Sequence, residues 1–248
     1  MKYDAKAFRI FNIDTASLPK TLYRYMPEWP YALGTLTTRY FHFSLISEFN
    51  DPFEGKFTEE EYSEDETWSK NIRTILDSKM IQLKESIEKE TGVLCFSETN
   101  DNILMWSHYA NSHKGIVIGF DPQFLCKQIT SSDFDSLLQS VQYDENYPQI
   151  EYLKEFNLVK QTKMIVDKWY FTKFRQWEYE KEWRAIYKSG LTQFPKEIIQ
   201  SVYFGAKFNP EKRDSWIKQI IDSGIKPEIY QASLDKTAYK INFEPITK

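Results

Sequence analysis

The sequence has few of the residues that build metal centres and disulfide frameworks. It contains only three histidines and two cysteines in 248 residues. Cys95 and Cys126 do not have the spacing of zinc ligands, and two cysteines are too few for a disulfide framework. His42, His108 and His113 include no pair that shares a helical face well. The sequence therefore predicts no bound metal and a reduced compartment.

Long apolar runs and phosphate-binding glycine motifs are also absent. No stretch of about 18 apolar residues occurs, and the N-terminus lacks the apolar run of a signal peptide. The sequence contains neither a GxGxxG nor a GxxxxGK[ST] motif, so neither a Rossmann nor a P-loop site is indicated. The formal net charge of −4 disfavours a large electrostatic footprint for nucleic acid. We expect a cytoplasmic protein with no membrane segment.

Aromatic residues, in contrast, are abundant. They make up 17% of the chain, as 18 Phe, 16 Tyr and 7 Trp. One interpretation is an aromatic-rich core, and the other is that some rings line a pocket for a flat ligand. Both interpretations stay open at this point.

Strand-like and helix-like patterns alternate along the whole chain. Strands are predicted at 21–27, 39–46, 93–98, 115–120, 141–145, 182–190, 198–208, 226–234 and 238–246. Helices are predicted at 59–90, 100–115, 152–174 and 210–224. This order predicts an α+β fold with a mixed, mostly antiparallel sheet and peripheral helices. We expect a single domain over residues 1–248, with a charged helical insertion at about 59–90 and either one sheet or two split sheets around a cleft.

The segment "QWEYEKEWRAIY" (176–187) is unusual because it concentrates like charges. The residues at every second position are Glu178, Glu180, Glu182 and Arg184. In a strand these side chains would share one face. That face could be a solvated surface with surface ion pairs, or it could turn carboxylates into a cleft. Under the second interpretation Glu178, next to the preceding loop, stays hydrated.

The glutamates of this segment are not expected to be equivalent. Glu182 lies deepest in the predicted strand, and Arg184 would keep its carboxylate ionised in a desolvated site. Glu180 lies between two other carboxylates and needs a cation, which Arg24 or Arg175 could supply. Glu182 is therefore predicted to be the functional carboxylate.

Several other polar residues interrupt apolar or aromatic sequence. Arg24, Trp106, His108 and Glu182 are far apart in the chain, yet buried polar groups need partners. The most economical arrangement brings the four together. We therefore predict that they converge on one pocket.

The segment "FNDPFEG" (49–55) has the residues of a turn after a strand. Asn50 or Asp51 is expected to hold the turn. Glu54 is expected to point to the cleft or to an arginine. Because loops on a rigid scaffold often carry function, this loop is predicted to border the pocket.

A set of motifs in a fixed order resembles a known family. "FNDPFE", "CFSE", "MWSHY", "KG" before an apolar strand, and "YEKEWR" follow one another between about Leu22 and Phe208. This set resembles the bacterial family catalogued as domain of unknown function 2971. The family name implies no activity.

A second resemblance, at the level of fold and residue order, is to ADP-ribosyltransferases. Those enzymes place a polar residue on the first strand, a serine or aromatic residue on a middle strand and a glutamate on a late strand. Here Arg24 would hold the first position and Ser97 or Ser44 the second, with Glu180 and Glu182 in a Glu-x-Glu motif as the third. The middle motif departs from the usual serine-threonine-serine run. The resemblance implies NAD as cofactor and an enzyme that transfers ADP-ribose.

The site that this resemblance implies has two groups of residues. The catalytic residues would be Glu182, Glu180, Arg24 and His108. The cofactor-binding residues would be Tyr23, Ser97, Trp106, Tyr109, Asn50 and Asp51. The acceptor would be a macromolecule, protein or nucleic acid, or a nucleotide, and a bacterial toxin or phage-defence effector would fit such an activity.

Two other functions remain open from the sequence. Asp51, Glu54 and Glu98 could hold a divalent metal in an effector that cleaves nucleic acid, because oxygen ligands on separate strands suit Mg²⁺. Alternatively, an aromatic pocket could bind a nucleotide without turnover, as a sensor module does.

Overall fold

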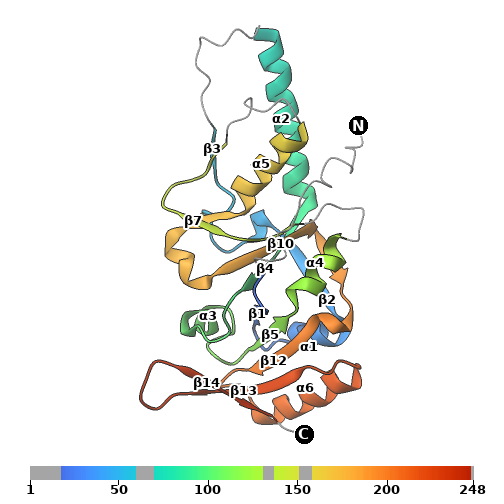
Figure 1. Ribbon diagram of the computed structural model, residues 1–248, viewed down its shortest axis with the longest axis vertical. Coiled ribbons are helices and arrows are strands. Elements are labelled where there is room, and N and C mark those ends of the chain that lie inside the picture. Colours follow the sequence, from blue (N-terminus) through green and yellow to red (C-terminus); the bar gives the residue numbers. More distant parts are fainter. Residues whose placement is uncertain (1–17, 60–69, 131–136, 151–157, 247–248) are drawn as a thin grey trace.

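The computed structural model describes residues 18–59, 70–130, 137–150 and 158–246. Its helices surround a large sheet (Figure 1). The α-helices are α1 (Pro30–Thr38), α2 (Lys70–Glu90), α3 (Ile103–His108), α4 (Pro122–Thr130), α5 (Leu158–Tyr170) and α6 (Pro210–Asp222). The 3₁₀ helices are η2 (Ile46–Glu48), η3 (Arg175–Glu180) and η4 (Lys196–Ile198).

The strands form one large sheet and two small ones. The strands of the large sheet are β1 (Leu22–Met26), β2 (Tyr40–Leu45), β4 (Thr91–Ser97), β5 (Ile116–Phe120), β6 (Leu137–Ser140), β10 (Glu182–Lys188), β11 (Gly190–Gln193), β12 (Ile199–Phe204), β13 (Glu228–Leu234) and β14 (Ile241–Pro245). Its pairs are antiparallel except β12–β13. The small sheets are β3 (Thr58–Glu59) with β8 (Gln149–Ile150), and β7 (Gln142–Asp144) with β9 (Thr172–Phe174). The predicted α+β fold with a mostly antiparallel mixed sheet is confirmed.

The large sheet branches at β4. One edge of β4 pairs with β10 along its whole length. The other edge pairs with β2 at Gly92 and Val93 but with β1 at Ser97. Between these two partners, the carbonyl of Cys95 accepts a hydrogen bond from the Arg24 guanidinium at 2.9 Å. The sheet therefore divides beside the middle of β4, in the part of the fold where a cleft was expected.

Local sequence explains the best-predicted elements. β5 is buried at every position, as its apolar, β-branched sequence indicates. α6 begins with Pro210 after Asn209, whose side chain accepts from the Lys212 amide at 3.0 Å, and a left-handed Gly224 follows its end. β13 and β14 form the expected hairpin.

The predicted helical insertion at about 59–90 is present as α2 from Lys70 onward, and residues 60–69 lie outside the described residues. α2 and α5 lie together at one end of the molecule (Figure 1). Leu83 and Ile87 of α2 join a buried cluster with Ile165 and Trp169 of α5. In the described part of the chain no helix is long and apolar enough to cross a bilayer.

The sequence-based predictions missed the helices α1 and α4, and two assignments around the charged segment are wrong. Residues 172–174 form β9 rather than the end of a helix. The charged segment is not one strand, because Arg175–Glu180 is a 3₁₀ helix and Lys181 has a left-handed φ of 44°. Only Glu182 and Arg184 keep the two-residue spacing of a strand face.

Candidate functional site

Arg184 is the centre of a buried ionic cluster that consists of Glu54, Lys173, Glu180, Glu182 and Arg184. Its side chain is 0% exposed. Its Nε donates to Glu182 Oε1 at 2.7 Å, and its two terminal nitrogens reach Glu54 Oε1 at 2.9 Å and the Tyr170 carbonyl at 2.6 Å. A planar guanidinium suits this geometry because its donors point in fixed directions. The pairing also raises the pKa of Arg184, although burial acts in the opposite direction.

Lys173 joins the three carboxylates of the cluster. Its Nζ lies 2.6 Å from Glu180 Oε2, 2.9 Å from Glu182 Oε2 and 3.4 Å from Glu54 Oε1. Burial lowers the pKa of Lys173, but the nearby carboxylates outweigh it and raise the pKa. Three carboxylates against two cations give the cluster a formal charge of −1.

The two glutamates that flank Lys181 differ in their partners. Glu182 is bound by Arg184 and Lys173, and these cations outweigh the effect of burial and lower its pKa to about 2. Glu180 accepts from the Tyr109 hydroxyl at 2.6 Å and from Lys173. Burial is the largest effect on Glu180 and raises its pKa. Proton uptake is therefore easier at Glu180 than at Glu182.

Two polar side chains hold the backbone around Glu180. Ser97 Oγ donates to the Glu180 carbonyl at 2.6 Å. Asn102 caps α3 with its side-chain oxygen, which accepts from the Met105 amide at 3.1 Å, and its amide nitrogen donates to the Tyr179 carbonyl at 2.8 Å. These contacts tie the 3₁₀ helix to β4 and to the start of α3. The backbone at Tyr179 and Glu180 is consequently held by two separate elements.

A cavity of about 370 Å³ opens at the branch of the sheet. We call it the branch cavity, and its walls come from β1, β2, β4, β9, β10, α3 and the 3₁₀ helices η2 and η3. The polar residues that matter here are Arg24, Ser97, Tyr109, Lys173, Glu180 and Glu182. Tyr23, Tyr25 and Phe49 add aromatic rings to its lining. This volume lies within the usual range for small-molecule sites, roughly 300–1,000 Å³.

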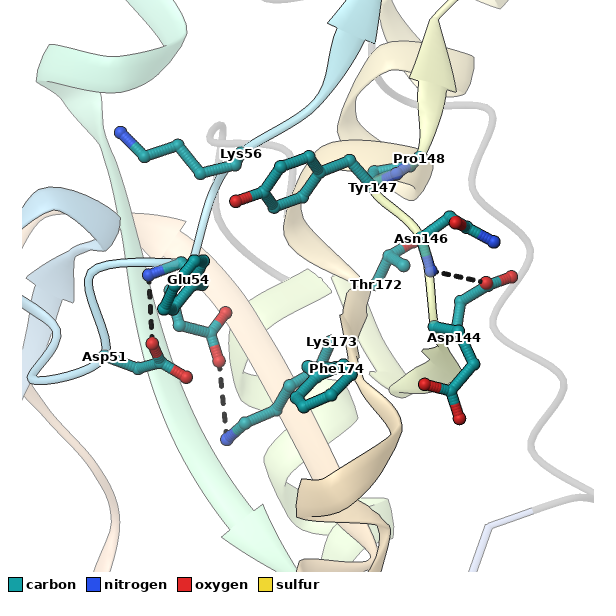
Figure 2. A pocket seen from close by; sticks show the side chains of 12 residues that line it. Asp51, Glu54, Lys56, Asp144, Asn146, Tyr147, Pro148, Thr172, Lys173 and Phe174 are labelled. Carbon is teal, nitrogen blue, oxygen red and sulfur yellow. Dashed lines mark hydrogen bonds and ion pairs between the residues drawn. The ribbon is translucent and has the colours of Figure 1, made fainter.

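A second cavity, of about 430 Å³, lies between two loops and strand β9 and is called the loop cavity. Its walls come from residues 51–56, 144–148 and 172–174 (Figure 2). Glu54 and Lys173 of the ionic cluster line it, and the pair is visible at the lower part of Figure 2. Lys173 lines both cavities. The ionic cluster therefore borders both the branch cavity and the loop cavity.

The structure brings most of the predicted cofactor-binding residues to the branch cavity. Tyr23, Asn50, Ser97 and Tyr109 line it. Asp51 lines the loop cavity instead. Its side chain accepts from the Phe53 amide at 2.9 Å and from the Trp177 indole at 2.8 Å, so it holds the turn, as predicted.

The predicted convergence of four residues is wrong in two of its members. Trp106 is a fully buried core ring whose indole donates to the Asn100 carbonyl at 2.6 Å. His108 is exposed at the end of α3 and does not line either cavity. The two residues lie on different faces of α3. Trp106 is on the face that packs into the core, and His108 is on the face exposed to solvent.

Arg24 and Glu182 both line the branch cavity, although they start from different faces of the sheet. Tyr23 and Glu182 are each in register with Ser97, so these three share a face. Arg24 is the next residue along β1 and starts from the other face. Its guanidinium reaches Cys95 at the branch, where the sheet is open. The proximity of the two residues is therefore a consequence of the branch.

Sequence reasoning missed Lys173 and assigned its role elsewhere. The cation beside Glu180 is Lys173, not Arg24 or Arg175. A lysine within the aromatic sequence "YFTKF" was the available signal, but a helix was predicted there. The expected pairing of Glu54 with an arginine is confirmed by Arg184, and Glu178 is exposed, as predicted.

The three carboxylates considered as metal ligands have other partners. Glu54 binds Arg184, Asp51 binds Trp177, and Glu98 accepts from the Trp183 indole at 2.7 Å. Within the described ranges, no three His, Cys, Asp or Glu side chains form a group that could hold a metal ion.

Acid should weaken the fold through Glu182. Its folded pKa of about 2 lies below the ordinary value of 4.5, so its contribution to stability is present above pH 4.5 and is lost as the pH falls toward 2. Glu180 acts with the opposite sign, because a raised folded pKa favours the folded state as acid is added. We expect Glu182→Gln to flatten the acid dependence of the free energy of unfolding between pH 4.5 and 2. Urea titrations at several pH values would measure this.

The matched control is Glu178→Gln, which removes an exposed carboxylate two residues before Glu180. It should leave the acid dependence as it is in the wild type. An unchanged slope in Glu182→Gln would contradict the assignment of the depressed pKa to this residue.

Comparison with known proteins gives one family match. A family model described as Protein of unknown function (DUF2971) matches residues 105–185, from α3 through the 3₁₀ helix to the middle of β10. No curated protein and no solved structure matches the chain. The matched part contains Tyr109, Lys173, Glu180, Glu182 and Arg184, so it carries most of the ionic cluster. The resemblance to this family is thereby confirmed for residues 105–185, which contain the "MWSHY", "KG" and "YEKEWR" motifs, and these residues match DUF2971, a family of unknown function. The comparisons do not show the second resemblance, to ADP-ribosyltransferases.

Proposed function

We propose that the protein is an enzyme that binds NAD in the branch cavity and transfers its ADP-ribosyl group to an acceptor. The observation that carries the proposal is the ionic cluster, whose formal charge of −1 is buried at a cavity that also holds an arginine and several tyrosines. Few other features of a fold need so many ionised groups out of water, because burying charges costs free energy.

The reaction would use the negative charge of this cluster. The bond between ribose C1′ and the nicotinamide nitrogen breaks, and its electron pair leaves with neutral nicotinamide. Positive charge then develops on the ribose, and a nearby carboxylate lowers the energy of this oxocarbenium-like state. We assign this role to Glu180, which lies on the cavity wall and is held by Tyr109 and Lys173.

The remaining steps involve other residues of the branch cavity. The acceptor nucleophile attacks C1′, and its proton passes to Glu180, whose raised pKa suits a proton acceptor of this kind. Arg24 would bind the pyrophosphate, and Tyr23 or Tyr25 would stack on a flat ring. Glu182 would act indirectly, since two cations, Arg184 and Lys173, bind it, whereas Glu180 is bound by one cation and one neutral hydroxyl.

A sensor that binds a nucleotide without turnover is the second candidate. The observation that favours it is that Glu54 and Glu182 are fully engaged with cations, as in a structural ion cluster. A cytoplasmic bacterial effector, such as a toxin or phage-defence component, fits the transferase better. The two candidates differ in one product, free nicotinamide.

The test is to titrate the full chain with NAD and to measure bound NAD and released nicotinamide in the same samples. Arg24→Gln should weaken NAD binding roughly ten- to hundredfold, since a hydrogen bond to a charged group contributes about 1.5–3 kcal/mol. Arg175→Gln is the control, because Arg175 is exposed and its contact with Glu145 is a long surface one, at 3.7 Å.

Three outcomes are distinguishable. Binding with release of nicotinamide supports the transferase. Binding that depends on Arg24 without any release supports the sensor. Absence of NAD binding to the wild-type chain contradicts both.

A further inference from the structure

The loop cavity has no role in the proposed reaction, yet the fold holds its walls in place. Residues 144–148 connect β7 to β8, and residues 172–174 are β9. The parallel pairs β7–β9 and β3–β8 tie the three wall segments together. The Trp169 indole donates to the Gly55 carbonyl at 2.7 Å, and Gly55 has a left-handed φ of 68° with Ile46 and Trp169 close to where a Cβ would lie. These contacts make the cavity a formed feature rather than a gap between loops.

Exposed aromatic rings from all three wall segments line this cavity. Phe53 is 64% exposed, Tyr147 is 46% exposed and Phe174 is 39% exposed. Figure 2 shows Tyr147 in the upper part of the wall and Phe174 in the lower part. Exposed large apolar side chains are common singly, but three that line one cavity form a surface that a flat ligand would cover.

The charges around these rings are predominantly negative. The carboxylates in the lining are Asp51, Glu54, Asp144 and Glu145, and the cations are Lys56 and Lys173. The formal charge of the lining is therefore −2. Glu54 and Lys173 are both paired within the ionic cluster, which leaves Asp51, Asp144 and Glu145 against Lys56. Glu145 lies at the exposed rim, 3.7 Å from Arg175. An anionic ligand would be repelled here.

We propose that the loop cavity is a second binding site, which takes a flat organic cation such as an aromatic amine. The faces of the rings attract a cation through their quadrupoles, and the rim carboxylates add Coulombic attraction. The flat body of the ligand would stack on Tyr147 and Phe174. This site does not depend on the proposed function, because NAD is assigned to the other cavity and only Lys173 lines both.

The experiment compares benzylamine with benzyl alcohol by calorimetry or by NMR titration of the full chain at neutral pH. The two probes have the same ring and nearly the same shape, but only benzylamine is a cation. Benzylamine should bind more tightly by about two- to thirtyfold, the range that corresponds to a cation–π contact. Equal affinity of the two probes, or no binding of benzylamine, would overturn the proposal.

Substitutions in the wall of the loop cavity test whether benzylamine binds there. Tyr147→Leu and Phe174→Leu should each weaken benzylamine binding, and Glu145→Gln should reduce the preference for benzylamine over benzyl alcohol. Tyr239→Leu is the control, since Tyr239 is a fully exposed ring in the β13–β14 hairpin. These side chains are exposed enough that the fold should survive, which thermal unfolding can verify. If both ring variants bind benzylamine as the wild type does, the cation binds elsewhere and the proposal is wrong.

Discussion

Arg184→Met is expected to lower the free energy of unfolding by about 3–5 kcal/mol, which is the usual cost of removing one partner from a buried ion pair. Methionine matches much of the volume of arginine, so the effect comes from the charge and its hydrogen bonds. Glu54 and Glu182 would stay buried with Lys173 as their nearest remaining cation. The Tyr170 carbonyl would also lose its donor. For a domain of this size the melting temperature should fall by roughly 6–20 °C.

The matched control is Arg175→Met. Arg175 and Glu145 are 56% and 59% exposed and 3.7 Å apart, so their pairing contributes little. Chemical denaturation of both variants measures the difference. If Arg184→Met unfolds at the wild-type midpoint, the cluster is not a determinant of the fold, and its carboxylates would have to be neutral.

The elements that the sequence predicted well are those whose signals are local. β5 is apolar at every position, and α6 has a polar cap, a proline at its first position and a glycine after its end. Such signals act within a few residues, so no knowledge of the rest of the chain is needed. The same holds for the turn at Asp51, whose side chain bonds to the amide of Phe53 two residues later.

The charged segment was predicted less well because its charged residues, spaced two apart, extend over two different secondary structures. Glu178 and Glu180 lie in a 3₁₀ helix, and Glu182 and Arg184 lie in a strand. Lys181 joins them with a left-handed φ that a lysine rarely adopts. Ser97 and Asn102 hold the 3₁₀ helix by hydrogen bonds from distant parts of the chain. A pattern read along the segment cannot contain these contacts.

The cavities also depend on long-range pairing. The branch cavity exists because β1 and β2 share one edge of β4, and the loop cavity is framed by two parallel pairs of short strands. Of these strands of two or three residues only β7 was predicted, because so short a strand carries little pattern. Glu54, Glu180 and Glu182 could be selected as unusual residues, but the role of Lys173 followed only from the assembled fold.

Glu180 and Glu182, two residues apart in the ionic cluster, have different roles. The low pKa of Glu182 means that its charged form stabilises the fold, whereas the raised pKa of Glu180 means that its charge is held at a cost. A charge held at a cost on a cavity wall is typical of functional sites. This difference predicts that neutralising Glu180 costs the fold little stability and that neutralising Glu182 costs more.

Glu180→Gln should therefore reduce nicotinamide release by roughly 100- to 1,000-fold, the loss that follows removal of one electrostatic stabiliser of a transition state. Glutamine keeps the size of the side chain and can still accept from Tyr109, while Lys173 keeps Glu54 and Glu182 as partners. NAD binding and the melting temperature should stay near wild-type values. Single-turnover release of nicotinamide from NAD at saturating enzyme measures the chemical step.

The control for this variant is Glu178→Gln, which neutralises an exposed carboxylate of the same 3₁₀ helix and should leave the rate unchanged. Tyr109→Phe removes only the hydroxyl that binds Glu180, so it should give a smaller loss than Glu180→Gln. Full turnover in Glu180→Gln together with a large loss in Glu182→Gln, at equal stability, would move the reacting role to Glu182. Full turnover in both variants would show that the cluster stabilises the fold and that the ribosyl cation, if it forms, is stabilised by other groups.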